Sequence, residues 1–219
     1  MKAIQIAKTG SADALQYIDI ERPVAGPDQV LVKVEAIGVN YADVLVRQGG
    51  IPTTSFPVIP GEEYSGTIEA VGCNVIDFTS GQRVAVLLGH GPDSGHVSGG
   101  YAGYAVAEAR SVITIPDAID FDTAAAVLAN YLTAYFLLHH AAQVRSGQRI
   151  LLYAAAGGGG TAMIQLAKLA GINVIGLTSS DERAAYAKSQ GAMYVINYRS
   201  EDLYESVMDI TNSCGIDII

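Results

Sequence analysis

The sequence predicts an α/β protein built in two parts, an antiparallel β-rich half followed by half of a doubly wound parallel sheet. Two observations lead to this prediction. Short segments of alternating apolar and polar residues, separated by turn residues, fill the chain up to about Pro116. Beyond that point, continuous apolar strands alternate with helical patterns, and a run of four glycines lies between the first of these strands and the next helix.

Seven segments of the first half have the two-residue period of half-buried strands. In the segment QVLVKVEA, for example, every second residue is valine or alanine. Glycine, proline and asparagine lie between the segments, as expected for strands joined by turns. The predicted strands cover residues 3–6, 15–20, 29–36, 65–71, 83–88, 101–107 and 112–115. We expect them to form an antiparallel barrel or sandwich.

The second half begins with a predicted helix over residues 124–142, for which Asp122 or Thr123 is the expected cap. Residues 149–154 then form a nearly continuous apolar run, which is typical of a central parallel strand covered on both faces. Strand and helix patterns alternate from there to the end of the chain. Strands are predicted at 172–178, 194–198 and 216–219, and helices through 184–188 and from about 201 to 210.

The helix that follows the glycine run has apolar residues at steps of three and four, which predicts one buried stripe. The residues of this stripe are Met163, Leu166, Ala167 and Ala170. The final predicted strand ends at Ile219 with no covering helix after it, which would leave a parallel edge bare. We therefore expect an incomplete version of a longer protein, prone to aggregate through this edge, with weak cofactor binding and doubtful activity by itself.

Composition excludes several classes of protein. Half of the 219 residues are hydrophobic and 16% are charged, so the chain can bury a core and is not disordered. The net charge of −9 argues against a nucleic-acid partner or a polybasic membrane surface. Cys73 and Cys214 are too few for a disulfide framework, and no segment has the roughly eighteen uninterrupted apolar residues of a membrane helix. We expect a soluble, cytoplasmic protein.

The glycine run has the properties of a pyrophosphate-binding loop. Glycines allow a pyrophosphate to approach the backbone, and the free N–H groups and dipole of the following helix attract its negative charge. Against the pattern G-x-G-x-x-G, the chain has Ala155 at the first position, then Gly157 and Gly160. The predicted loop residues are Ala156, Gly157, Gly158, Gly159, Gly160 and Thr161. The alternative is a tight turn that only allows helix and strand to pack closely.

The residues after strand 172–178 predict which dinucleotide binds. NAD-binding proteins have an acidic residue at this strand end for the ribose hydroxyls, whereas this chain has Thr178, Ser179 and Ser180 there, followed a few residues later by Arg183. Hydroxyl groups and a guanidinium suit a 2′-phosphate, so we expect NADPH. The same residues have a purely structural alternative, since Ser179 and Glu182 also match a helix capping box.

Seven further motifs occur in one order along nearly the whole chain. They are GVNYAD at 38–43, PGEEYSG at 60–66, GQRV at 81–84, GYA at 100–102, LTAY at 132–135, IQLAK at 164–168 and VINY at 195–198. In this order they resemble the medium-chain dehydrogenase/reductase superfamily, and within it the zinc-free quinone oxidoreductase branch. The resemblance implies a GroES-like β-barrel domain over residues 1–120. It also implies a Rossmann-type NADP-binding domain over 121–219 that lacks its C-terminal part.

The resemblance implies that no metal is bound. Zinc-dependent relatives have a cysteine where this chain has Asn40, a histidine where it has Glu62, and a third ligand near Ala129; one carboxylate cannot hold a catalytic zinc. His90 and His96 lie in a glycine-rich loop, where we interpret them as surface histidines rather than metal ligands.

The resemblance also implies roles for individual residues. Asn40 and Tyr41 are the expected catalytic residues beside the nicotinamide and the substrate. Thr133 is expected near the nicotinamide ring, and Tyr198 and Arg183 near the ribose phosphate. The structural alternatives are a turn-forming Asn40, a Tyr41 packed under a loop and a Thr133 in the core of an apolar helix.

The expected activity is therefore hydride transfer from NADPH to a quinone or an α,β-unsaturated carbonyl, by a protein that is a homodimer when complete. Two alternatives stay open. One is an enoyl-thioester reductase on the same scaffold. The other is a non-catalytic NADPH-binding protein, because residues 128–135 also resemble the vesicle-transport relatives of quinone reductases.

Overall fold

The computed structural model describes residues 1–51, 56–88 and 99–219. These residues separate into two compact units, Met1–Ala129 and Asn130–Ile219. The boundary between the units falls inside helix α2 (Phe121–Tyr135), a little after the predicted division at residue 120. The position of His90 and His96 lies outside the described residues.

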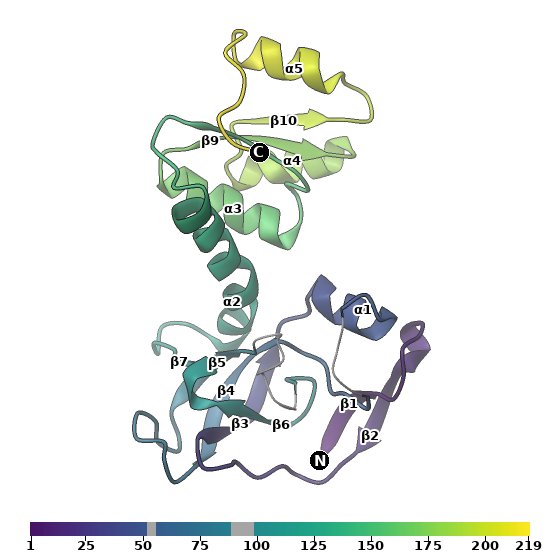
Figure 1. Cartoon of the computed structure of the whole chain (residues 1–219), viewed down its shortest axis with the longest axis vertical. Helices are drawn as coiled ribbons and strands as arrows, with labels where there is room; N and C mark the ends of the chain where they lie inside the picture. The colour runs from purple at the N-terminus through teal and green to yellow at the C-terminus, as the bar shows by residue number, and fades with distance from the viewer. Residues whose placement is uncertain (52–55, 89–98) are drawn as a thin grey trace. The chain divides into compact units, whose positions relative to one another are not determined.

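The first unit consists mainly of antiparallel strands, close to the predicted positions (Figure 1). They are β1 (Lys2–Ile6), β2 (Leu15–Asp19), β3 (Gln29–Ile37), β4 (Glu63–Val71), β5 (Arg83–Leu87), β6 (Tyr104–Glu108) and β7 (Val112–Thr114). Two short 3₁₀ turns, η1 (Ala12–Ala14) and η2 (Ala109–Ser111), precede β2 and β7. Five strands form one sheet in the order β6-β3-β4-β5-β7, and β1 and β2 form a separate pair.

The predicted closed barrel is not formed by the strands in the described part of the chain. β6 and β7 are the two edges of the five-stranded sheet. The β1–β2 pair is joined to the rest of the unit by isolated antiparallel bridges, between Ala3 and Ala102 near the β6 edge and between Ile6 and Val58. The three residues of β7 offer little backbone for a further partner, so hydrogen bonding does not continue around the sheet. What the prediction identified correctly is the antiparallel class and the strand positions.

The core of this unit follows the strand alternation. Side chains from all five strands of the large sheet form one buried cluster that includes Val32 of β3, Tyr64 of β4 and Val84 of β5. The first half of α2 packs on the opposite side, where Ala124 and Leu128 contact residues of β5 and the segment after β7. The sheet is thus covered on a second face by the helix that leads into the second unit.

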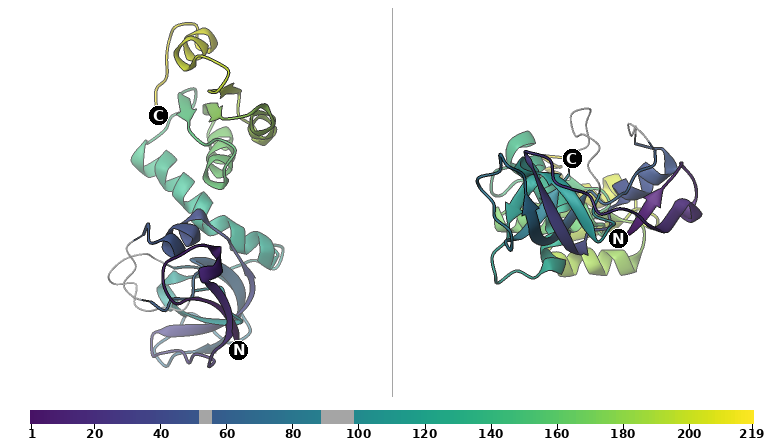
Figure 2. Two further views of the ribbon diagram at one scale, coloured as in Figure 1. Left: turned by 90° about the vertical axis from the view of Figure 1, so that its right-hand side faces the viewer. Right: turned by 90° about the horizontal axis from the view of Figure 1, so that it is seen from below.

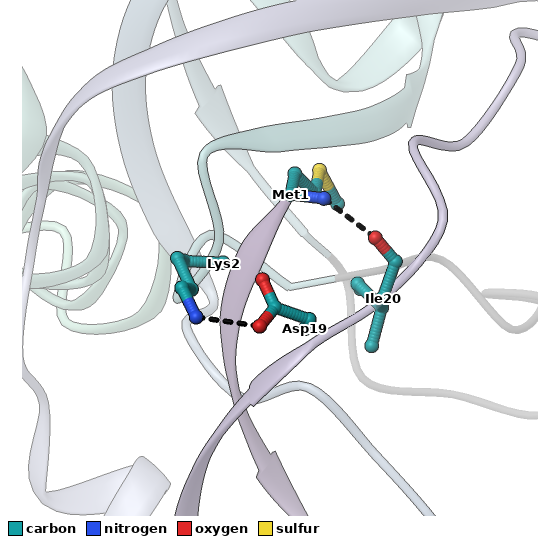
Figure 3. Close-up of polar contacts among 4 residues, drawn as sticks. All are labelled: Met1, Lys2, Asp19 and Ile20. Atoms are coloured by element: carbon teal, nitrogen blue, oxygen red, sulfur yellow. Dashed lines mark hydrogen bonds and ion pairs between the residues drawn. The ribbon is translucent and has the colours of Figure 1, made fainter.

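A short helix, α1 (Tyr41–Gln48), was not predicted from the sequence. It lies beside the β1–β2 pair (Figure 2). Two hydrogen bonds join it to Gly10 in the loop between β1 and β2: Gly10 N donates to Arg47 O at 2.9 Å, and Arg47 Nη1 donates to Gly10 O at 2.7 Å. At the other end of the pair, the amino terminus donates to Ile20 O at 2.6 Å (Figure 3). The first two contacts thus join α1 to the loop between β1 and β2, and the third joins the start of β1 to the residue after β2.

The second unit contains a parallel sheet with helices on both faces. Its elements are β8 (Arg149–Leu152), α3 (Gly158–Leu169), β9 (Asn173–Thr178), α4 (Asp181–Gln190), β10 (Tyr194–Asn197) and α5 (Leu203–Ile210). The strand order is β10-β9-β8, and Ile218 forms a parallel bridge with Ile150 on the free side of β8. The strand order therefore reverses at β8, as in one half of a doubly wound sheet.

Alternate residues of these strands face opposite layers. One buried cluster joins Ile150 and Val174 to Ile164 of α3 and Ala187 of α4. The other joins Leu151, Ile175 and Ile196 to Val207 of α5. Helices α3 and α4 accordingly cover one face and α5 the other (Figure 1). This arrangement confirms the prediction of central strands that are apolar on both faces.

The predicted stripe of α3 needs correction. The fully buried residues of this helix are Ala162, Ile164 and Ala167, whereas Met163, Leu166 and Ala170 are only partly buried. The helix packs with α4 and Leu138 as well as with the sheet. Its buried face therefore differs from the face that would be buried against the sheet alone.

Helix α2 begins at Phe121, three residues before the predicted range, and its cap is neither Asp122 nor Thr123. Asp120 Oδ1 accepts a hydrogen bond from Thr123 N at 2.6 Å, as an N-cap residue does. The helix continues as a π-helical segment, η3 (Phe136–Ala141). Among the described residues, Phe121–Ala141 is long and apolar enough to cross a membrane. This is only weak evidence for a membrane span, because core helices of soluble proteins share the same length and composition.

This cap gives a stability prediction. The hydrogen bond from the Thr123 backbone lowers the pKa of Asp120. A carboxyl group with a lowered pKa stabilises the folded state above its ordinary pKa, and this contribution is lost as the pH falls through the folded value. We expect Asp120→Ala to lower the thermal midpoint at pH 7 by more than the control Asp122→Ala. The effect should shrink when circular dichroism melts are repeated below pH 3.8. An equal effect at both pH values would contradict the capping role.

Candidate functional site

The glycine run occupies the turn between β8 and α3. Gly157 is the N-cap of α3 in an extended conformation, and its N–H donates to Ala154 O at 2.9 Å. Gly157, Gly158 and Gly159 are exposed, whereas Ala156, Gly160 and Thr161 are half-buried. The first N–H groups of a helix have no partner within the helix. The exposed Gly158 and Gly159 therefore present backbone donors to an approaching anion.

The glycines of this loop differ in whether the surrounding structure leaves room for a side chain. A Cβ atom on Gly160 would lie 2.4 Å from Ala154 O and 2.8 Å from the carbonyl carbon of Ala155, so the close approach of helix and strand requires glycine here. A Cβ on Gly159 would meet only Asn130 Oδ1 at 3.8 Å, an ordinary contact. The tight-turn interpretation thus explains Gly160, and it leaves the exposed Gly158 and Gly159 available for a ligand.

The strand end after β9 brings the predicted phosphate residues together. Arg183 Nη1 donates to Ser179 Oγ at 3.2 Å, and Ser180 Oγ accepts from Arg183 N at 3.3 Å. The N-cap of α4 is therefore Ser180, which corrects the capping box proposed for Ser179 and Glu182. Within the described ranges Arg183 forms no ion pair, so its charge is not neutralised by a neighbouring carboxylate.

Tyr198 follows β10 directly and is 52% exposed. Its backbone N–H donates to Thr178 O at 3.1 Å, which places Tyr198 next to the end of β9. Thr133 is exposed on α2. Its neighbour one helical turn earlier, Asn130, approaches the glycine loop, since a Cβ on Gly158 would lie 3.0 Å from Asn130 Oδ1. Residues three apart share a helix face, so Thr133 lies on the face that meets the loop.

The topology of the second unit explains why the loop and the strand end form one site. Both follow the carboxyl ends of adjacent parallel strands, β8 and β9. The order of strands reverses at β8, because Ile218 lies on its other side and accepts from Leu151 N at 2.9 Å. In doubly wound sheets, ligands bind at the carboxyl ends of strands where the order reverses.

A second group of polar residues surrounds Asn40 in the first unit. Asn40 is the N-cap of α1, and its Nδ2 donates to Glu63 Oε1 at 2.8 Å. The other carboxyl oxygen of Glu63 accepts from Ala129 N at 2.7 Å. Glu63 is 1% exposed, and a Cβ on Gly38 would lie 2.4 Å from Glu63 Oε1, so glycine at 38 makes room for this carboxyl group.

Asp43 holds the backbone around Asn40. One of its oxygens accepts from Asn40 N at 2.9 Å and from the Tyr101 hydroxyl at 3.1 Å, and the other accepts from Gly61 N at 2.9 Å. Burial, followed by the nearby Asp43, raises the pKa of Tyr101, so this hydroxyl stays protonated as a donor. Tyr41 is 73% exposed at the first position of α1. It is therefore not an aromatic residue packed under a loop.

The residues at the expected metal positions do not fit a zinc ion. The Asn40 amide and the Ala129 N–H both donate to Glu63, so two of the three positions supply hydrogen-bond donors rather than metal ligands. Zinc sites are built from cysteine, histidine and carboxylate ligands. No group of three such residues comes together in the part of the chain that the structure describes.

Glu63 and Asn130 were not identified from the sequence as site residues. Glu63 is the second of two adjacent acidic residues, and no local pattern distinguishes the buried one from its neighbour. An acidic residue at the start of a largely buried strand becomes informative only with the structure, because a buried carboxyl group needs specific partners. Asn130 had a weaker signal, a polar residue within an apolar helical pattern.

The fold and site define a class of protein in which an antiparallel β unit precedes a dinucleotide-type α/β unit. Residues 26–117 match the alcohol dehydrogenase GroES-like domain family, and residues 158–219 match the zinc-binding dehydrogenase family. The chain belongs to the medium-chain dehydrogenase/reductase superfamily.

Individual relatives support this assignment. The quinone oxidoreductase of Pseudomonas aeruginosa is 37% identical over 211 residues, which are 96% of this chain and 63% of the relative. The human quinone oxidoreductase is 35% identical over 221 residues, which cover all of this chain and 65% of the relative. The crystal structure of Escherichia coli quinone oxidoreductase complexed with NADPH matches with a TM-score of 0.92 and 31% identity, over 99% of this chain and 64% of that one. The chain thus spans slightly less than two thirds of these relatives.

Proposed function

We propose that this chain binds NADPH and belongs to an oxidoreductase that transfers hydride to a quinone or an α,β-unsaturated carbonyl. The observation that supports it best is the Ser179–Arg183 hydrogen bond at the end of β9, beside the exposed glycine loop. A positive side chain and two hydroxyl groups at this position suit a ribose 2′-phosphate. The relative from Escherichia coli was crystallised with NADPH.

Different residues of the second unit would bind different parts of NADPH. The backbone from Ala156 to Thr161 would hold the pyrophosphate, because the exposed glycines and the start of α3 present N–H donors. Ser179, Ser180, Arg183 and Tyr198 would hold the ribose 2′-phosphate. Thr133, one turn along α2 from Asn130, would lie by the nicotinamide. When bound, NADPH supplies the hydride.

The first unit would contribute hydrogen-bond donors for the substrate. Negative charge that develops on a substrate oxygen needs donors when no metal acts as Lewis acid. The Asn40 side chain donates to Glu63 beside the start of α1, and the next residue, Tyr41, is 73% exposed. Because Glu63 and Asp43 fix Asn40 at both its side chain and its backbone, the amide is preorganised. We propose that the proton for the product comes from solvent.

The test of this function separates it from both alternatives. NADPH consumption is followed with 1,2-naphthoquinone, 9,10-phenanthrenequinone and crotonyl-CoA as separate acceptors. Turnover with either quinone supports the proposal, and turnover with crotonyl-CoA alone would favour an enoyl-thioester reductase. NADPH binding by calorimetry without turnover of any acceptor would favour a non-catalytic binding protein. Homodimerisation and a cytoplasmic location stay predictions, which sedimentation and cell fractionation of the complete protein can test.

Arg183→Ala should weaken NADPH binding about tenfold to a hundredfold, because a hydrogen bond to a charged group is worth about 1.5–3 kcal/mol. NADH affinity should change little, since NADH lacks the extra phosphate. Lys188→Ala is the matched control, because it removes the same charge from the last turn of α4, away from the strand end. Both affinities are measured by calorimetric titration. Equal weakening of NADPH and NADH would refute the role of Arg183.

A further inference from the structure

Asn197 connects the end of β10 to the start of α4. It is 8% exposed, and its Nδ2 donates to Asp181 Oδ1 at 2.8 Å. Its Oδ1 accepts from Arg199 N at 3.2 Å, and its own N–H donates to Glu201 Oε1 at 2.8 Å. Both ends of the side-chain amide are thus engaged, which fixes its orientation.

Asp181, like Glu182, is an acidic residue between Ser180 and Arg183 of the proposed phosphate site. It is the first residue of α4, directly after the cap Ser180 and two positions before Arg183. The two charged side chains nevertheless have different partners, since Asp181 is bonded to Asn197 and Arg183 to Ser179. No Asp181–Arg183 ion pair occurs among the described residues. The positive charge of Arg183 is therefore preserved for a ligand.

We propose that Asn197 determines the nucleotide preference by holding the Asp181 carboxyl group away from the Ser179–Arg183 pair. This inference rests on the proposed NADPH function and assigns a residue that sets its specificity. A released Asp181 side chain could pair with Arg183 or face the 2′-phosphate, and either contact lowers the attraction for that phosphate. A carboxyl group near this strand end also accepts hydrogen bonds from the ribose hydroxyls of NADH. Asn197 is a positioning residue, because it acts through Asp181.

An exchange of the two side chains tests this role. In Asn197→Asp the residue still accepts from Arg199 N, but its second oxygen now repels Asp181. In the double variant Asp181→Asn with Asn197→Asp, the amide at 181 donates to the carboxyl group at 197, so the hydrogen bond returns with reversed polarity and unchanged net charge. Asn197→Ser is a second variant, which releases Asp181 without adding charge. Asn212→Asp is the control for added charge, because Asn212 follows the last turn of α5, at the opposite end of that helix from β10.

The measured quantity is the ratio of the NADH and NADPH dissociation constants of the 219-residue chain, from calorimetric titrations. We expect Asn197→Asp to lower the preference for NADPH by about threefold to tenfold, Asn197→Ser to lower it in the same direction, and the double variant to restore it to within about twofold. Asn212→Asp should leave the ratio unchanged. A ratio unchanged by both Asn197→Asp and Asn197→Ser, or not restored in the double variant, would overturn the role of Asn197 alone. Wild-type protein without affinity for either nucleotide would overturn the proposed function as well.

Discussion

Glu63→Ala should lower the free energy of unfolding of the chain by about 2–4 kcal/mol. The substitution leaves Asn40 Nδ2 and Ala129 N without the acceptor that both now share. A buried polar group deprived of its partner costs about 1–3 kcal/mol. Because the side chain of Glu63 is 1% exposed, water cannot simply replace the lost carboxyl group.

Urea unfolding followed by circular dichroism measures this effect. Glu35→Ala is the matched control, since Glu35 is an exposed residue of β3 whose ion pair with Lys33 should contribute less than about 1 kcal/mol. The double variant Asn40→Asp with Glu63→Gln restores a hydrogen bond between the two positions, so it should recover most of the lost stability. It removes the amide donor at 40, so it should not recover reductase activity. A Glu63→Ala effect no larger than that of Glu35→Ala would show that the buried network does not stabilise the fold.

Gly160→Ala should destabilise the second unit by about 1–3 kcal/mol and weaken NADPH and NADH together. The new methyl group would lie 2.4 Å from Ala154 O, which is backbone and cannot move without displacing the loop from β8. A displaced loop no longer aims its N–H groups at the pyrophosphate, which both nucleotides share. The expected pattern therefore differs from that of Arg183→Ala, where only NADPH is affected.

Gly159→Ala provides the control within the same loop. Its methyl group would make an ordinary contact at 3.8 Å with Asn130 Oδ1, and alanine in a helix is more favourable than glycine by up to about 1 kcal/mol. We therefore expect the stability of Gly159→Ala to equal or exceed that of the wild type in thermal melts. If Gly160→Ala melts at the wild-type temperature, the close approach of helix and strand is not what requires glycine at 160.

Much of the fold could be predicted because it depends on neighbours in the sequence. The strands of the first unit were found by their two-residue period, and β8 by its apolar run, because burial on one or two faces selects side chains locally. The eight residues of α1 are too few for a clear helical period, so this helix was not predicted. The cap of α2 was missed by two residues, since several acidic and hydroxyl side chains nearby could serve equally well.

The sequence by itself determined the two-part organisation, the glycine loop and the residues proposed for the phosphate, because each depends on spacing within one strand, loop or helix. Only the tertiary structure decided that Glu63 binds Asn40 and Ala129, that Asn197 holds Asp181, and that Ile218 lies beside β8. The partners in these pairs are 16 to 68 positions apart in the sequence, from the Asp181–Asn197 pair to the Ile150–Ile218 bridge. The path of the chain brings them together, and no local preference of a residue specifies that path.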